Sequence, residues 1–279
     1  MSQEFVEKHK EIIYNSKTPS AVLMESIFEL MNEGSLESKE ILFDIARNHK
    51  CELIRHETIF AIGEIGPDKD IRDFLKETLN VDSSIVVQHE ALVVLGLLGV
   101  EEDRAFLEQF LEDERIEISQ SAKVGIQRIG QKFDFYSEVL KDEESEREFR
   151  NKLEDIQIVC ENDRIQIMFQ LMKHDTSENA QAIYKRFTQD PCPIVRHEAA
   201  FCLGEMSSDE AFSYLSKGVF EQEFPIAIHE ALFALGTTGR EEALEVLNQF
   251  IDNENYIISQ SAVIGKEKIE LVKNPYRGV

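Results

Sequence analysis

The chain contains 279 residues, 42% of them hydrophobic, and carries a formal net charge of −24 from 54 acidic and 30 basic side chains. So negative a surface repels nucleic acid, because nucleic-acid binding depends on lysine and arginine displacing counterions from phosphates. No apolar run approaches the roughly 18 to 20 residues that span a membrane, and the N-terminal residues have no apolar signal core, so we expect a cytoplasmic protein without a membrane segment.

Apolar residues at spacings of three and four positions predict helices, which we take in chain order. The segments are 21–34, 55–66, 71–79 and 87–99, followed by 162–173, 195–206, 227–239 and 241–251. Turns are indicated by Gly66-Pro67-Asp68 and by Asp190-Pro191. No segment shows the alternation of a strand, so the sequence predicts an all-α fold.

The second group of segments repeats the first at an offset of about 140 residues. The stretch Ile118-Ser119-Gln120-Ser121-Ala122, for example, returns as Ile258-Ser259-Gln260-Ser261-Ala262. We therefore expect two related halves, residues 1–141 and 158–279, joined by a charged connector at 142–157. A shorter period of 32 to 33 residues inside each half, with two helices per repeat, predicts a helical solenoid of about four helix pairs per half. HEAT repeats fit this period best, because the ankyrin and tetratricopeptide signatures are missing.

Four His-Glu pairs stand at the same helical position in four of these repeats, and each histidine is followed seven residues later by glycine. The pairs are His56-Glu57, His89-Glu90, His197-Glu198 and His229-Glu230. A single pair of this kind is ordinarily a core histidine with its hydrogen bonds satisfied. Four pairs indicate a function, because a buried carboxylate without a partner is strongly unfavourable. The last repeat of each half carries Gln120-Ser121 or Gln260-Ser261 instead, so the helix pair forms without the dipeptide.

Imidazole and carboxylate without thiolate suit iron, manganese or zinc. Two histidines and one carboxylate per metal, with open positions, are typical of non-haem iron that activates oxygen. Four pairs give one such set per half and leave two glutamates over. The zinc-protease pattern HExxH is absent. The four cysteines form no CxxC pair and indicate small buried residues in a reducing compartment. We expect the other histidines, His9, His49 and His174, to lie on the surface.

These helices resemble the family of deoxyhypusine hydroxylases, diiron HEAT-repeat monooxygenases. The resemblance covers nearly the whole chain and rests on RHETIFAIGEIG (55–66), VQHEALVVLGLLG (87–99), VRHEAAFCLGEM (195–206) and AIHEALFALGTTG (227–239). It implies one iron held by His56, His89 and Glu90, and a second held by His197, His229 and Glu230. It also implies that Glu57 and Glu198 grip an amine-bearing substrate. Gln88 and Ile228 depart from the family, which often has arginine before the histidine.

The resemblance implies a reaction in which dioxygen hydroxylates deoxyhypusine, a spermidine-modified lysine of a translation factor, to give hypusine. The net charge of −24 suits such a polycationic side chain. Two alternatives stay open: a HEAT-repeat scaffold that binds proteins without catalysis, and a HEAT-like lyase or chaperone acting on pigment proteins, which needs no metal.

Overall fold

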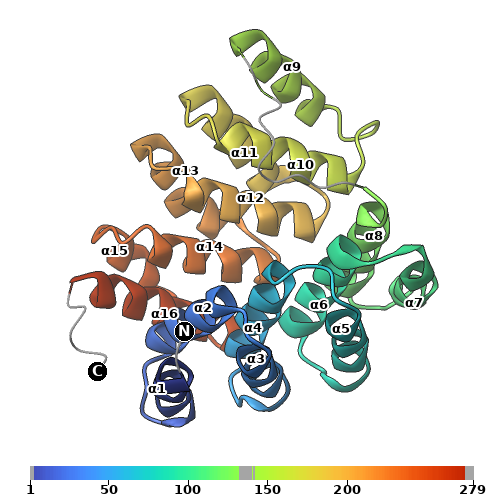
Figure 1. Cartoon of the computed structure of the whole chain (residues 1–279). Helices are drawn as coiled ribbons and strands as arrows, with labels where there is room; N and C mark the ends of the chain where they lie inside the picture. Colours follow the sequence, from blue (N-terminus) through green and yellow to red (C-terminus); the bar gives the residue numbers. More distant parts are fainter. Residues whose placement is uncertain (1–2, 132–139, 141, 274–279) are drawn as a thin grey trace. The chain divides into compact units, whose positions relative to one another are not determined.

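The structure is a computed structural model that describes residues 3–131, 140 and 142–273 (Figure 1). These residues form helices and turns and contain no strand, so the all-α prediction is confirmed. Within this described part, no helix is long and apolar enough to cross a membrane. The described residues divide into two compact units, which we call unit 1 (residues 3–131 and 273) and unit 2 (residues 140 and 142–272).

Unit 1 consists of four consecutive helix pairs. Its helices are α1 (Gln3–Tyr14), α2 (Ser20–Glu33), α3 (Leu36–Asn48), α4 (Glu52–Glu64), α5 (Lys69–Val81), α6 (Ile85–Leu98), α7 (Arg104–Leu107) and α8 (Ile116–Arg128). Short 3-10 turns at Glu101–Asp103 and Glu108–Phe110 flank α7. The second helices of successive pairs pack side by side in the order α2, α4, α6, α8, and this order lines up the positions that carry the His-Glu pairs (Figure 1).

Unit 2 repeats this plan with four further pairs. Its helices are α9 (Glu143–Glu154), α10 (Glu161–Met172), α11 (Ser177–Gln189), α12 (Pro193–Glu205), α13 (Asp209–Gly218), α14 (Pro225–Thr237), α15 (Ala243–Leu247) and α16 (Tyr256–Lys273). A 3-10 turn at Val219–Glu221 follows α13. The charged stretch at 142–157, which was expected to connect the halves, contains α9. The expected eight helix pairs are found in the described residues, whereas the limits of the halves at residues 141 and 157 stay a prediction.

Local chemistry explains where the helices begin. The side chains of Asp68, Thr176 and Ser208 accept hydrogen bonds from the first backbone N–H groups of α5, α11 and α13. Pro193 and Pro225 stand at the first positions of α12 and α14, where the missing N–H of proline is not needed. Caps of this kind fix the register of each helix, and the register decides which side chains face the neighbouring pair.

The outer and inner helices differ in how much of their surface is buried. Helix α5 buries one stripe, which consists of Ile71, Phe74, Leu75, Thr78 and Leu79, as an amphipathic surface helix does. Helix α6 is buried on nearly all sides from Val86 to Gly96, because α4, α5 and α8 all pack against it. A His-Glu pair on α6 is therefore inside the protein whichever way it points.

One expectation about the remaining histidines is wrong. His9 is only 2% exposed and lies on the buried face of α1 with Val6 and Ile13. Its Nε2 atom is 2.9 Å from the carboxylate of Glu29. His49 and His174 are partly exposed.

Candidate metal centre

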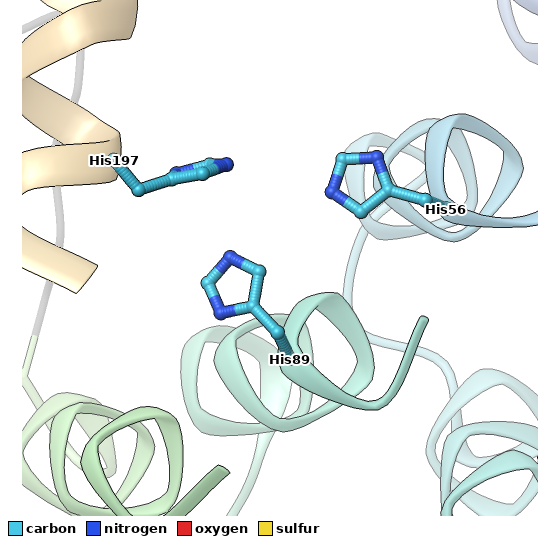
Figure 2. A group of neighbouring side chains, drawn as sticks. All are labelled: His56, His89 and His197. Carbon is cyan, nitrogen blue, oxygen red and sulfur yellow. The ribbon is translucent and has the colours of Figure 1, made fainter. Parts of the chain in front are cut away.

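In unit 1, neighbouring helices bring two imidazoles together. His56 projects from α4 and His89 from α6, with exposed fractions of 3% and 0% (Figure 2). Their ring centroids are 6.3 Å apart and the ring planes differ by 15°. A ring nitrogen of His56 lies within 4.8 Å of one of His89, which is close enough for both to reach one ion. Figure 2 also draws His197, which belongs to unit 2 and is described there.

A carboxylate completes the set in unit 1. One oxygen of Glu90, Oε2, lies 3.6 Å from Nε2 of His56 and 3.9 Å from Nε2 of His89. Glu90 is 6% exposed, so this carboxylate is held inside the protein with the two imidazoles. The second glutamate, Glu57, has Oε1 3.2 Å from Nδ1 of His56, on the other side of that ring. Glu90 thus faces the Nε2 atoms of both histidines, whereas Glu57 is next to Nδ1.

Unit 2 contains the same arrangement on α12 and α14. Nε2 of His197 is 3.4 Å from Oε2 of Glu230, and the ring centroids of His197 and His229 are 6.2 Å apart with an interplanar angle of 39°. One ligand atom from each of His197, His229 and Glu230 lies within 4.8 Å of the other two, and all three residues are buried. Glu198, the remaining member of the pairs, is partly exposed.

The two units follow one rule of contact. In each of them, the glutamate of the second His-Glu pair contacts the histidine of the first pair. Glu90 contacts His56, and Glu230 contacts His197. In the last repeat of each unit, a serine occupies the position that corresponds to this glutamate. Oγ of Ser121, on α8, is 2.8 Å from Nδ1 of His89.

The matching serine of unit 2 makes the same contact. Oγ of Ser261, on α16, is 2.8 Å from Nδ1 of His229. From the sequence we predicted no role for these serines, although the identical stretch in both halves was a signal that could have pointed to one. The structure therefore adds two residues to the surroundings of the predicted ligands.

The donor set of each unit fits a first-row transition metal. Two imidazoles and one carboxylate are ligands that iron, manganese and zinc accept, and a divalent cation offsets the cost of burying the carboxylate. Among the described residues, no cysteine belongs to a group of side chains close enough together to hold one ion. Cys202, four residues after Glu198, is fully buried, and its pKa is raised well above the ordinary value by that burial and by the charges of Glu198, Glu205 and Glu230.

The structure thus brings the six predicted ligands together three by three, as His56, His89 and Glu90, and as His197, His229 and Glu230. It places Glu57 beside the first set and Glu198 next to His197 along α12. Metal binding by these residues, and substrate binding by Glu57 and Glu198, stay predictions.

Comparison with known proteins adds independent information. The family model of HEAT repeats matches residues 40–124 and 180–265. The deoxyhypusine hydroxylase of Candida albicans is 28% identical over 238 residues, which cover 72% of this chain and 72% of the relative. The deoxyhypusine hydroxylase of Drosophila melanogaster is 24% identical over 232 residues, covering 78% and 76%.

A solved structure shares the fold. The structure of human deoxyhypusine hydroxylase in complex with glycerol superposes with a TM-score of 0.82, at 21% sequence identity and with 96% of each chain covered. The predicted HEAT-repeat fold is confirmed by this match and by the family model. The resemblance noted in the sequence is confirmed as well, because the curated relatives carry the name of that family.

Proposed function

This chain belongs to the HEAT-repeat family, and we propose that it is a deoxyhypusine hydroxylase that uses two non-haem iron ions and dioxygen. The observation that carries the proposal is the duplicated set of two imidazoles and one buried carboxylate, one set in each unit. A fold alone does not define a function, since many HEAT-repeat proteins only bind others. The names of the curated relatives suggest the substrate, and the two sets of metal-binding side chains suggest the type of reaction.

Six residues hold the metal in this proposal. His56, His89 and Glu90 bind one iron, and His197, His229 and Glu230 bind the other. Two histidines and one carboxylate would leave open positions on an iron ion, and the chemistry that the iron would supply there is the activation of dioxygen. The four imidazoles are at most 6% exposed, so the surrounding protein keeps most water away from them.

Glu57 and Glu198 bind the substrate in this proposal. Deoxyhypusine carries amino groups that are protonated at neutral pH, and a carboxylate holds such a group by charge-assisted hydrogen bonds. Each of the two glutamates follows a metal-binding histidine, so its side chain lies about 100° around the helix from that histidine. Holding the amine there fixes how far the aliphatic chain extends toward the iron, and this distance selects the C–H bond that reacts.

Charge and cysteine chemistry support the partner and the compartment of this proposal. We place the reaction on a translation factor in the cytoplasm. A net charge of −24 attracts a basic protein segment at low ionic strength. All four cysteines are free thiols, as is usual in a reducing compartment.

The test is a reaction with purified components. The full chain is loaded with iron(II) and incubated with a deoxyhypusine-bearing factor, isotopically labelled dioxygen and a chemical reductant, which supplies the two electrons that reduce the second oxygen atom to water. The factor is then analysed by mass spectrometry. We expect about two irons per chain and the gain of one labelled oxygen atom. Glu57→Ala should retain its iron and bind the factor less tightly. Thr58→Val, at a buried neighbour on the same helix, is the matched control and should behave as the wild type.

Two results would contradict the proposal. If the iron-loaded chain binds the factor but leaves it unmodified, the scaffold alternative is correct. If Glu57→Ala loses iron together with factor binding, the division between ligands and substrate-binding carboxylates is wrong.

A further inference from the structure

We infer that Ser121 and Ser261 are positioning residues that hold His89 and His229 in the tautomer protonated at Nδ1, so that Nε2 carries the lone pair that binds metal. This inference rests on the proposed metal-binding function of the two histidines. It gives a role to the stretch Ile-Ser-Gln-Ser-Ala, which occurs once in each half. In this stretch Gln-Ser occupies the helix position at which other repeats have His-Glu.

The two hydrogen bonds of each serine determine which atom donates in its contact with the histidine. Oγ of Ser121 is 2.5 Å from the backbone carbonyl oxygen of Glu117 and 2.8 Å from Nδ1 of His89. A hydroxyl has one hydrogen, and a carbonyl oxygen can only accept, so the hydroxyl donates to Glu117. The remaining partner must then donate to the hydroxyl, which places a hydrogen on Nδ1 of His89. The opposite assignment would leave two oxygens 2.5 Å apart with no hydrogen between them, which is repulsive.

Unit 2 repeats the same geometry with other residues around it. Oγ of Ser261 donates to the carbonyl oxygen of Ile257 at 2.7 Å and accepts from Nδ1 of His229 at 2.8 Å. Ser121 and Ser261 are both fully buried, so water does not compete for either hydroxyl. The two copies differ at many neighbouring positions, yet both retain this chain of hydrogen bonds.

Close packing of two helices makes the contact possible. Gly96 lies seven residues after His89, and Gly125 four residues after Ser121. A Cβ atom built on Gly96 would be 2.3 Å from Cα of Gly125, so the backbones of α6 and α8 touch at this point. A side chain as short as serine can therefore reach the imidazole across the two helices.

The consequence is a fixed ligand atom. In a neutral imidazole with hydrogen on Nδ1, the lone pair is on Nε2, and Nε2 of His89 is the atom that faces Glu90. Hydrogen-bond partners of metal-binding histidines fix the tautomer and the ring orientation, and their loss commonly weakens metal binding by about 10- to 100-fold. We expect a loss of this size at one of the two sites when either serine is replaced by alanine.

The first experiment measures the tautomers without metal or substrate. Nitrogen-15 NMR of histidine side chains is recorded on the full chain, stripped of metal and kept at about pH 8, above the ordinary pKa of imidazole. In the wild type, His89 and His229 should both carry hydrogen on Nδ1. In Ser121→Ala, the signals of His89 should change to a mixture of tautomers while those of His229 stay as they were. Ser261→Ala should show the reverse.

Each unit is thus the control for the other, and Thr58→Val is a second control. Thr58 is fully buried, and its hydroxyl also donates to a carbonyl four residues earlier, that of Ile54, at 2.6 Å. Its replacement removes a hydroxyl of the same kind but should change neither tautomer. Circular dichroism of each stripped variant confirms that the helices are intact.

The second experiment is an anaerobic titration of the same variants with iron(II). Ser121→Ala should bind one equivalent as the wild type does and the other about 10- to 100-fold more weakly. If His89 keeps hydrogen on Nδ1 in Ser121→Ala, or if both equivalents bind with unchanged affinity, the inference is wrong. Failure of the proposed function gives another pattern, in which the tautomers respond as expected but the wild type does not hydroxylate the factor.

Discussion

Replacing Gly96 with alanine places a methyl group against the backbone of the neighbouring helix α8. The added Cβ would lie 2.3 Å from Cα and 2.4 Å from the carbonyl oxygen of Gly125, whereas real Cβ atoms essentially never approach another atom within 3.0 Å. Neither atom belongs to a side chain that can rotate away. Helix α8 must therefore move, and Ser121 moves with it.

The cost can be estimated from two opposing effects. Overpacking a core costs about 1–3 kcal/mol, and we take the upper end because backbone atoms block the methyl group. Alanine is favoured over glycine inside a helix by about 1 kcal/mol. The net loss of about 2 kcal/mol should lower the melting temperature by about 4–8 °C, at about 2–4 °C per kcal/mol for a domain of this size.

Thermal unfolding followed by circular dichroism measures this loss, and Gly63→Ala is the matched control. Gly63 stands at the same position of the preceding repeat, but the nearest atoms to its added Cβ are methyl groups of Val94, at 2.8 and 3.1 Å. That side chain can adjust, so we expect little change. If Gly96→Ala melts at or above the temperature of Gly63→Ala, the argument from backbone contact is wrong.

Three further changes test other parts of the structure. Glu90→Ala should lose one of two bound irons, measured by elemental analysis, and unchanged iron content would exclude Glu90 as a ligand. Arg164→Ala should cost about 3–5 kcal/mol in denaturant unfolding, because it leaves the carboxylate of Asp190 buried beside Arg186, which is 3.7 Å away and does not replace the two 2.9 Å hydrogen bonds from Arg164. Burial lowers the pKa of His9 below its ordinary value of 6.5, so the unfolded chain takes up a proton first as the pH falls. The free energy of unfolding should therefore decrease as the pH falls below about 6.5, and His9→Gln should flatten that decrease; an equally steep decrease in His9→Gln would refute this role.

Part of the candidate site could be predicted from the sequence because it depends on spacing along single helices. The His-Glu pairs recur at the repeat period, and consecutive repeats stack, so His56 and His89 had to come from neighbouring helices. The same reasoning fixed the partner set in unit 2. The burial of His9 was missed although Val6, His9 and Ile13 share a helix face, because His9 belongs to none of the repeated His-Glu pairs.

The sequence by itself determined the helical repeats, the duplication and the residue types of the candidate site, since each is a matter of local periodicity and residue chemistry. Only the tertiary structure decided which atoms meet. That Glu90 faces Nε2 of His56, and that Oγ of Ser121 lies 2.8 Å from Nδ1 of His89, depends on how closely α4, α6 and α8 approach. The distance between α6 and α8 is set by backbone contact at Gly96 and Gly125. The sequence period of a helix does not predict how far that helix lies from its neighbour.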